Sequence, residues 1–384
     1  MAAKKERTRS IKGSEGPTLE QVMADMNVRF GEGTMFSGST MKRDPIRLPT
    51  GVFAVDYATG GGFPIHGSTC LWGPESSAKS TLAIKAMASA SHLCWKCWNF
   101  LPACTCSTEP LKMRASWVDV EGTMDRFWAE CLGASPETYI AAIAEYGEQY
   151  IDIAEAALRA DDCGLLVIDS LAALVPEAEF DAPSEDQFMA LQARMIGRGV
   201  RKLKQRMLRE MKREHPCTIV FTNQMRKKIG VMFGDPETMS GGHGMFHEFS
   251  LILRCVKKAL DKKGTDAKYV DVSRTKDMAS RHSFSIRKEK MLTLAGVGEF
   301  VIVKEDIPEL ELTKGMIDDF KTVSNYAREY GVLEKTDKGY VLFDGKTASK
   351  LEDIHKFWKK FPVDYMRAQS EIIKNAKARI AGKK

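Results

Sequence analysis

The sequence contains no long apolar run. No stretch approaches the roughly 20 consecutive apolar residues that a membrane-spanning helix needs, so we expect no membrane partner. The first ten residues, MAAKKERTRS, are basic and lack the apolar core of a secretory signal, which predicts a cytoplasmic location. An internal repeat is also missing. These absences argue against membrane-spanning, exported and repeat proteins.

The composition is that of an ordinary globular protein. Hydrophobic residues make up 43% and charged residues 28% of the 384 residues, enough for a substantial core. The formal net charge of +6 is mild, so it permits a nucleic-acid partner without requiring one. Nine cysteines without an export signal predict reduced thiols, with metal ligands before disulfides.

Changes in sequence pattern divide the chain into segments. We expect a disordered basic tail at 1–17, a helix and arm at 18–48, a core at 49–308 and a small α+β C-terminal domain at 309–384, with a hairpin at 339–345. Within the core, helical patterns alternate with apolar runs that end in polar residues. These runs are STCLW, ASWVDVE, GLLVIDS and TIVFTNQ, followed by FSLILRC, HSFSIRK and FVIV. The alternation predicts an α/β fold with a mostly parallel sheet flanked by helices.

A phosphate-binding loop follows the first of these runs. The loop GPESSAKST lies between the run STCLW and a helical pattern, which is the context that such a loop requires. Backbone N–H groups and a helix N-terminus there provide a nest for a triphosphate. We expect Lys79 to reach the β- and γ-phosphates and Ser80 to help hold Mg²⁺. The predicted nucleotide contacts are Gly73, Pro74, Glu75, Ser76, Ser77, Ala78, Lys79, Ser80 and Thr81.

One residue departs from the loop pattern GxxxxGK[ST]. Ala78 stands where the second glycine belongs. Alanine costs little there if the position has helical dihedral angles, because glycine is needed mainly where φ is positive. The alternative interpretation of the whole segment is a glycine- and serine-rich turn that only caps a helix.

Polar residues at the ends of other runs favour the nucleotide site. Asp169 ends LLVID, where a carboxylate is costly unless it binds a metal ion directly or through water. Glu121 is placed to orient an attacking water as a base, and Gln224 to contact the γ-phosphate. Each residue alone is open to a structural interpretation. Together they favour a ligand site, since ligands of open parallel sheets lie at the carboxyl ends of strands.

Four motifs carry a family resemblance. GPESSAKS, VDVEGTMD, LLVIDSLAAL and TNQMRKKIGVMFGDPETMSGG together resemble the RecA family of bacterial and phage recombinases, over roughly residues 18–375. The resemblance implies a RecA-type P-loop ATPase core and a cytoplasmic location in a bacterium or in the host of a phage. It also implies that Glu121 is catalytic, that Asp169 is the Walker B aspartate, and that Gln224 couples nucleotide to DNA.

The resemblance assigns further nucleotide residues. Asp125 and Trp128 fall where the family holds the adenine, with tryptophan in place of a tyrosine. Lys288 and Lys290 align with lysines that reach the γ-phosphate bound by the adjacent subunit. As bare residues, these two lysines are more typical of surface charges.

The segment at 225–244 has the composition of a nucleic-acid loop. It is glycine-rich and basic at its start, yet it carries apolar residues that need a partner surface. Basic groups follow phosphates, and apolar groups enter base steps. A loop folded over its own core is the alternative, but the resemblance implies the second DNA loop of the family. The predicted contacts are Arg226, Lys227, Lys228, Ile229, Gly230, Val231, Met232, Phe233, Gly241 and Gly242.

The expected first DNA loop, at 176–189, is acidic, so its composition alone does not indicate DNA binding. The helix that follows is more informative, since its basic residues form stripes at helical spacing. Such stripes are usually solvated surface. The resemblance places Met189, Arg194 and Arg201 at DNA. It leaves a second stripe to solvent or to another partner: Lys202, Arg206, Arg209 and Arg213.

Two stretches depart from the family pattern. Phe246, His247 and Glu248 stand where the family shows lysine, phenylalanine and an aromatic residue at the subunit junction. The resemblance also does not cover an insertion at 92–110, whose cysteines form CxxC-x6-CxC. Four thiolates at this spacing can enclose Zn²⁺, and redox-active or merely reduced thiols are the alternative. The cysteines are Cys94, Cys97, Cys104 and Cys106.

The resemblance implies a DNA-dependent ATPase that forms filaments on single-stranded DNA and promotes pairing and strand exchange with a homologous duplex. Its expected cofactors are ATP and Mg²⁺, with Zn²⁺ at the cysteines. One alternative is a filament-forming accessory protein with little ATP turnover, and another is a ring-shaped helicase motor. The C-terminal region resembles the family's DNA-gathering domain but ends in KARIAGKK rather than in an acidic tail, so we expect weaker restraint of duplex binding.

Overall fold

The structure is a computed structural model that describes residues 16–40, 46–180, 189–212, 215–227, 237–241, 244–271 and 276–382. Contacts divide the chain into two units, Met1–Asp44 and Pro45–Lys384. The second unit contains the core strands together with the C-terminal segment. The finer boundaries expected at residues 17, 48 and 308 stay predictions.

The first unit is built around helix α1 (Leu19–Phe30), which confirms the helix expected there. Thr18 caps it, since the Thr18 hydroxyl accepts from the Gln21 N–H at 3.3 Å and the Gln21 side chain accepts from the Thr18 N–H at 2.8 Å. Leu19 and Val28 are 77% and 86% exposed. The cap therefore stabilises this helix, while Leu19 and Val28 stay uncovered within the unit.

The second unit is organised by a sheet of nine strands, counted over the described residues. From β9 through β3, β7, β6 and β4 to β5 the pairings are parallel, whereas β12 pairs antiparallel with β9 and β13, and β8 with β7. This confirms the mostly parallel sheet. In spatial order the main strands are β13 (Val297–Val303), β12 (Ala279–Glu289), β9 (Leu251–Lys258), β3 (Ser68–Gly73), β7 (Thr218–Lys227), β6 (Cys163–Asp169), β4 (Arg114–Asp119) and β5 (Tyr139–Ala142), with β8 (Glu237–Met239) beside β7.

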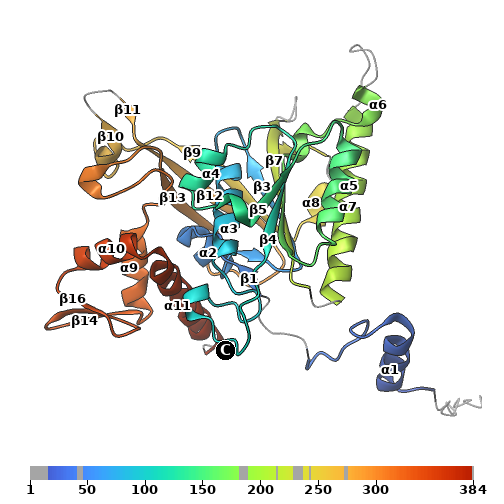
Figure 1. Ribbon diagram of the computed structural model, residues 1–384, viewed down its shortest axis with the longest axis horizontal. Helices are drawn as coiled ribbons and strands as arrows, with labels where there is room; N and C mark the ends of the chain where they lie inside the picture. Colours follow the sequence, from blue (N-terminus) through green and yellow to red (C-terminus); the bar gives the residue numbers. More distant parts are fainter. Residues whose placement is uncertain are drawn as a thin grey trace, which may run out of the picture. The chain divides into compact units, whose positions relative to one another are not determined.

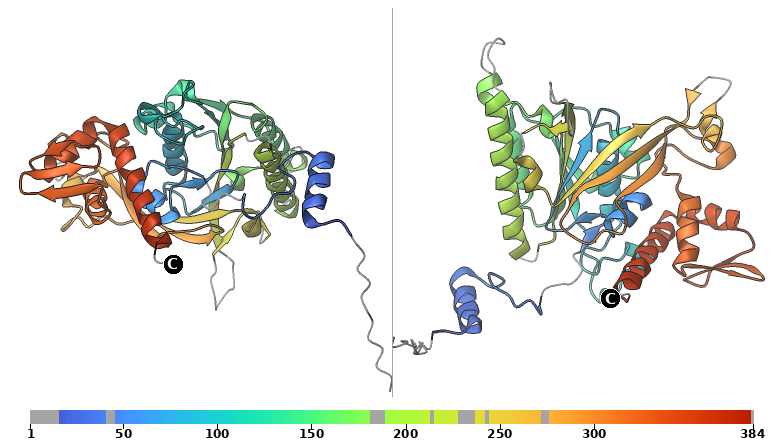
Figure 2. Two further views of the ribbon diagram at one scale, coloured as in Figure 1. Left: turned by 90° about the horizontal axis from the view of Figure 1, so that it is seen from below. Right: turned by 180° about the vertical axis from the view of Figure 1, so that it is seen from behind.

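Helices cover both faces of the sheet (Figures 1 and 2). One face carries α2 (Phe53–Thr59) and α3 (Lys79–Ser91), and the other carries α5 (Gly147–Ala157) and the long α7 (Met189–Lys212). The latter two helices approach closely, since a Cβ on Gly199 would lie 2.4 Å from a methyl group of Ile151. The shorter elements are β1 (Arg47–Leu48), β2 (Phe63–Pro64), α4 (Arg126–Cys131), α6 (Glu177–Phe180), α8 (Met245–Glu248), β10 (Val270–Asp271) and β11 (Lys276–Asp277).

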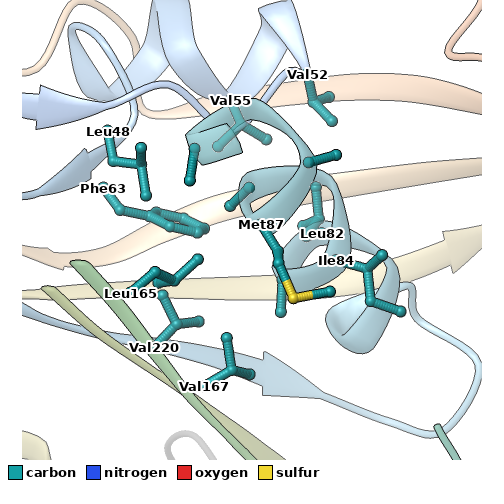
Figure 3. Close-up of a cluster of buried hydrophobic side chains, with 14 of the residues drawn as sticks. Leu48, Val52, Val55, Phe63, Leu82, Ile84, Met87, Leu165, Val167 and Val220 are labelled. Atoms are coloured by element: carbon teal, nitrogen blue, oxygen red, sulfur yellow. The ribbon is translucent and has the colours of Figure 1, made fainter. Parts of the chain in front are cut away.

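Alternating side chains of the strands build a separate apolar cluster on each face. Leu71 of β3 joins the cluster under α3, while its neighbours Cys70 and Trp72 join the cluster under α5 and α7. Figure 3 shows Met87 of α3 beside residues of β6 and β7, including Leu165. Burial on both faces explains why the strand sequences read as continuous apolar runs.

The C-terminal segment has its own core, which also includes residues of β13 and α2. Trp358 and Phe320 are buried there with Val301 of β13 and Phe53 of α2. The expected hairpin is confirmed as β15 paired with β16, and β14 adds a third strand that the sequence did not predict. The elements are α9 (Phe320–Glu329), β14 (Leu333–Thr336), β15 (Gly339–Leu342), β16 (Thr347–Ala348), α10 (Leu351–Lys360) and α11 (Pro362–Ala381).

Candidate nucleotide site and DNA interface

The phosphate loop connects the end of β3 to the start of α3, as the sequence predicts. Gly73 is required because a Cβ there would lie 2.1 Å from the backbone oxygen of Cys255 in β9. The Lys79 ammonium folds back over the loop and donates to the backbone oxygens of Pro74 at 2.7 Å and Gly73 at 3.2 Å. Burial lowers the pKa of Lys79, against the opposing effect of nearby anionic groups that include Asp169. A phosphate oxygen is the partner that this buried cation fits best.

Ala78 does not have the helical dihedral angles that would make alanine neutral in the loop. Its φ is 71° and its ψ is 24°, which is the left-handed region. This conformation costs a residue with a Cβ about 1–2 kcal/mol, and glycine avoids the cost. The irregular residue of the loop is therefore a strained one, and it is buried at the N-cap of α3.

The polar strand ends meet at one edge of the sheet. In the strand register Gly73 is paired with Gln224, and Asp119 is paired with Asp169. The N–H groups of Val120 and Glu121 both donate to the backbone oxygen of Asp169, at 2.9 and 3.3 Å. The structure thus brings Glu121, Asp169 and Gln224 together beside the phosphate loop.

Asp169 has the surroundings of a cation ligand. It is 4% exposed, and the hydroxyls of Thr222 and Ser80 both donate hydrogen bonds to its carboxylate. Burial raises the pKa of Asp169, while these hydrogen bonds oppose that rise. A divalent cation among Asp169, Ser80 and phosphate oxygens would compensate the buried charge, so the residues present fit Mg²⁺.

Glu121 is held at the opening of this site. Its Oε1 atom accepts a hydrogen bond from the Ser170 hydroxyl at 2.5 Å and one from the Gln224 side-chain amide at 3.5 Å. The residue itself is exposed, so a water molecule can approach its carboxylate. Glu121 and Gln224 are therefore in direct contact with each other.

Three positioning residues of this site were missed by sequence reasoning. Asp119 accepts from the N–H groups of Thr123 at 3.2 Å and Met124 at 2.9 Å, which fixes the turn that follows Glu121. Thr222 and Ser170 bond to Asp169 and Glu121 as described above. A signal was present, because all three lie at the ends of the same apolar runs as the predicted residues.

The two residues predicted at the adenine lie at the start of α4. The Asp125 carboxylate accepts from the Trp128 N–H at 3.1 Å and caps the helix, which gives Asp125 a structural task of its own. Trp128 is half-buried, and the Lys314 ammonium lies 5.7 Å from its ring centre. Their contact with adenine stays a prediction.

Lys288 and Lys290 lie at and just beyond the end of β12, next to the residues that depart from the family pattern. The Lys288 ammonium donates to the Phe246 backbone oxygen at 2.7 Å, and burial lowers its pKa. Lys290 is exposed. Glu248, also on α8, forms an ion pair with Lys204 at 3.1 Å. Phe246 thus contacts Lys288, while Lys290 stays accessible to another molecule.

The predicted second DNA loop rises from a β-ribbon. Strand β7 runs past Gln224 to Lys227 and pairs with β8, which places Arg226 opposite Thr238. Arg226 is exposed, and Gly241 follows the ribbon with a φ of 95°. Part of the predicted set lies outside the described residues: Lys228, Ile229, Gly230, Val231, Met232, Phe233 and Gly242.

Helix α7 brings basic side chains to the base of that ribbon. Arg194, Arg198 and Arg201 line one surface hollow together with Gly241. Within the described part of the chain, no acidic side chain lies within ion-pair distance of Arg194 or Arg201. Met189 begins the helix.

In the second basic stripe of α7, two side chains form ion pairs within the chain. Lys202 pairs with Asp152 at 2.6 Å and Arg206 with Glu210 at 2.7 Å. Arg209 is exposed, and Arg213 lies outside the described residues. Intramolecular ion pairs therefore use much of this stripe, which leaves the Arg194 and Arg201 surface as the freer one.

Comparison with known proteins settles the family. Residues 17–296 match the RecA N-terminal domain. The chain belongs to the RecA family. Among similar proteins, Protein RecA of Geobacter sulfurreducens is 32% identical over 303 residues, which cover 78% of this chain and 82% of the relative. Protein RecA of Clavibacter michiganensis is 33% identical over 335 residues, covering 87% and 82%.

A mitochondrial DNA repair protein recA homolog of Dictyostelium discoideum is 32% identical over 251 residues, which cover 65% of this chain and 50% of that relative. Membership of the RecA family supports a general role in DNA recombination and repair, with ATP and DNA as ligands and with self-assembly. None of the described helices combines the length and apolar character that a membrane crossing requires.

Proposed function

We propose that this protein is a DNA-dependent ATPase that forms filaments on single-stranded DNA and promotes homologous pairing and strand exchange. One observation carries the proposal. Gln224 contacts Glu121 at 3.5 Å, is paired with Gly73 of the phosphate loop, and lies on the strand that continues into the ribbon of the second DNA loop. A single residue thus links the nucleotide site to the DNA interface.

In this proposal Lys79 and Ser80 hold the triphosphate, and Ser80 and Asp169 hold Mg²⁺. Glu121 orients the attacking water, and the Ser170 hydroxyl keeps its carboxylate in place. Lys290, and Lys288 once its bond to Phe246 is released, would reach the γ-phosphate of an adjacent subunit. Mg²⁺ neutralises charge on the phosphates when it is bound. The four cysteines of the insertion have no part in this proposed hydrolysis, because they follow the end of α3 that lies away from the phosphate loop.

Arg194, Arg201 and Arg226 would contact the DNA backbone, and base pairing would supply sequence recognition. A change at Gln224 on hydrolysis would pass directly into β7 and its ribbon. ATP would thereby control the grip on DNA. Because arginine–phosphate contacts release counterions, binding should weaken steeply with added salt.

A Glu121→Gln variant tests this assignment. ATP hydrolysis should fall by roughly 100-fold or more, since a general base contributes about that much. Extended filaments on single-stranded DNA with ATP should still be visible by electron microscopy, and the exposed Glu334→Gln variant should match the parent protein in both measurements. Full hydrolysis in Glu121→Gln contradicts the base assignment, and isolated monomers in all three proteins contradict the filament.

A second candidate is a filament-forming accessory protein with little ATP turnover. The strained Ala78 and the altered residues around Lys288 favour it. The hydrolysis rate measured with and without single-stranded DNA separates the two functions. Stimulation by DNA supports the ATPase, and filaments without hydrolysis support the accessory protein.

A further inference from the structure

The insertion between α3 and β4 gathers four cysteines at one point. The sulfur atoms of Cys94, Cys97, Cys104 and Cys106 all lie within 4.8 Å of one another. The Cys94–Cys106 separation is 3.8 Å and the Cys97–Cys104 separation is 3.6 Å. Zn–S bonds of about 2.3 Å in a tetrahedron place two sulfurs about 3.8 Å apart. A disulfide would need about 2.05 Å, so the spacing is that of metal ligands.

A tight turn holds the first pair of cysteines together. The Trp98 N–H donates to the Cys94 oxygen at 2.7 Å, and Trp98 has a left-handed φ of 61°. The Cys94 N–H donates to the Asn99 oxygen at 2.9 Å, which closes the turn that contains Cys97.

We propose that Cys94, Cys97, Cys104 and Cys106 bind one Zn²⁺ and that this ion has a structural role. Four protein sulfurs complete a tetrahedral shell and leave no position for substrate or water, which is the arrangement of structural rather than catalytic zinc.

The proposed ion would fix the insertion to the ATPase core through Trp95. This residue lies between the first two cysteines and is 2% exposed. Its indole N–H donates to the Ala90 oxygen of α3 at 3.1 Å, and its backbone N–H donates to the Leu111 oxygen before β4 at 2.8 Å. Its ring also lies against Gly164 of β6, where a Cβ would approach it to 2.7 Å. Loss of zinc should therefore loosen three core elements at their ends away from the phosphate loop.

Metal analysis of the full-length protein tests the proposal. The protein is purified without a metal-affinity column, and zinc and iron are measured by mass spectrometry. One zinc per chain is expected. A chain with no stoichiometric zinc, or with iron in its place, overturns the proposal. Replacement by Co²⁺ should give the intense visible absorption of a tetrahedral thiolate site, and an octahedral spectrum would likewise overturn it.

Matched variants locate the ligands. Cys97→Ser and Cys106→Ser should lose zinc, and their melting temperatures should fall, whereas Cys131→Ser on α4 should keep both unchanged. Zinc retained in both ligand variants contradicts the site. If those variants do not fold, the zinc content and cobalt spectrum of the parent protein still decide. A chelator should expose four further reactive thiols, and rapid disulfide formation in untreated protein would favour a redox role instead.

Discussion

Ala78 departs from the phosphate-loop pattern of the family, and its left-handed conformation gives this departure a measurable effect on stability. A left-handed alanine is strained by about 1–2 kcal/mol, whereas an alanine inside a helix is favoured over glycine by about 1 kcal/mol. Ala78→Gly should therefore have a free energy of unfolding about 2–3 kcal/mol higher than Ala83→Gly, which makes the same change within α3. Denaturant unfolding of both variants checks this, and equal losses of stability contradict the strain.

The sequence predicts which strand ends meet at the nucleotide site, but not the side-chain hydrogen bonds within it. Glu121, Asp169 and Gln224 end apolar runs, and parallel strands bring such ends to one edge of a sheet, so their meeting could be predicted. The bonds of Ser170 to Glu121 and of Thr222 to Asp169 depend on side-chain orientation, which strand periodicity does not specify. The left-handed φ of Ala78 likewise depends on how the loop closes.

At the scale of elements, α7 lies between the segments that we predict to be the two DNA loops. Its Gln192 side chain donates to the Leu174 oxygen at 2.8 Å, near the start of the first loop, and its arginines reach Gly241 beside the second. The basic stripes of this 24-residue helix could be predicted from sequence, but the ion pair of Lys202 with Asp152 could not, since Asp152 is distant along the chain.

An Arg201→Ala variant tests whether the side of α7 that carries Arg194 and Arg201 contacts DNA. Removing one phosphate contact should weaken single-stranded DNA binding and reduce the slope of log affinity against log salt by roughly 1. Arg209→Ala, on the same helix and also exposed, should leave both quantities unchanged. Titrations at several salt concentrations measure both variants, and equal effects would show that only the net charge of the helix matters.

At the scale of the whole molecule, one chain holds only part of the proposed reaction site. Glu121 lies beside its own phosphate loop, whereas exposed Lys290 directly follows β12, which lies beyond β9 in the sheet. The family resemblance could predict that Lys290 acts on a neighbour, but a single chain contains no contact that tests it. Subunits that are defective in different halves of the site supply that test.

Mixed filaments of Glu121→Gln and Lys290→Ala subunits should hydrolyse ATP although each variant alone does not. A site is intact where the nucleotide is bound by a Lys290→Ala chain, which keeps Glu121, and the neighbour is a Glu121→Gln chain, which keeps Lys290. In a random equal mixture this holds at half of a half of the interfaces, so roughly a quarter of the parent rate is expected from head-to-tail contacts.

A mixture with Lys338→Ala in place of Lys290→Ala controls for dilution, because Lys338 is an exposed lysine of the C-terminal segment. Those control filaments should lose activity only in proportion to the Glu121→Gln chains. If the first mixture stays as inactive as its two components, Lys290 does not act across the subunit interface.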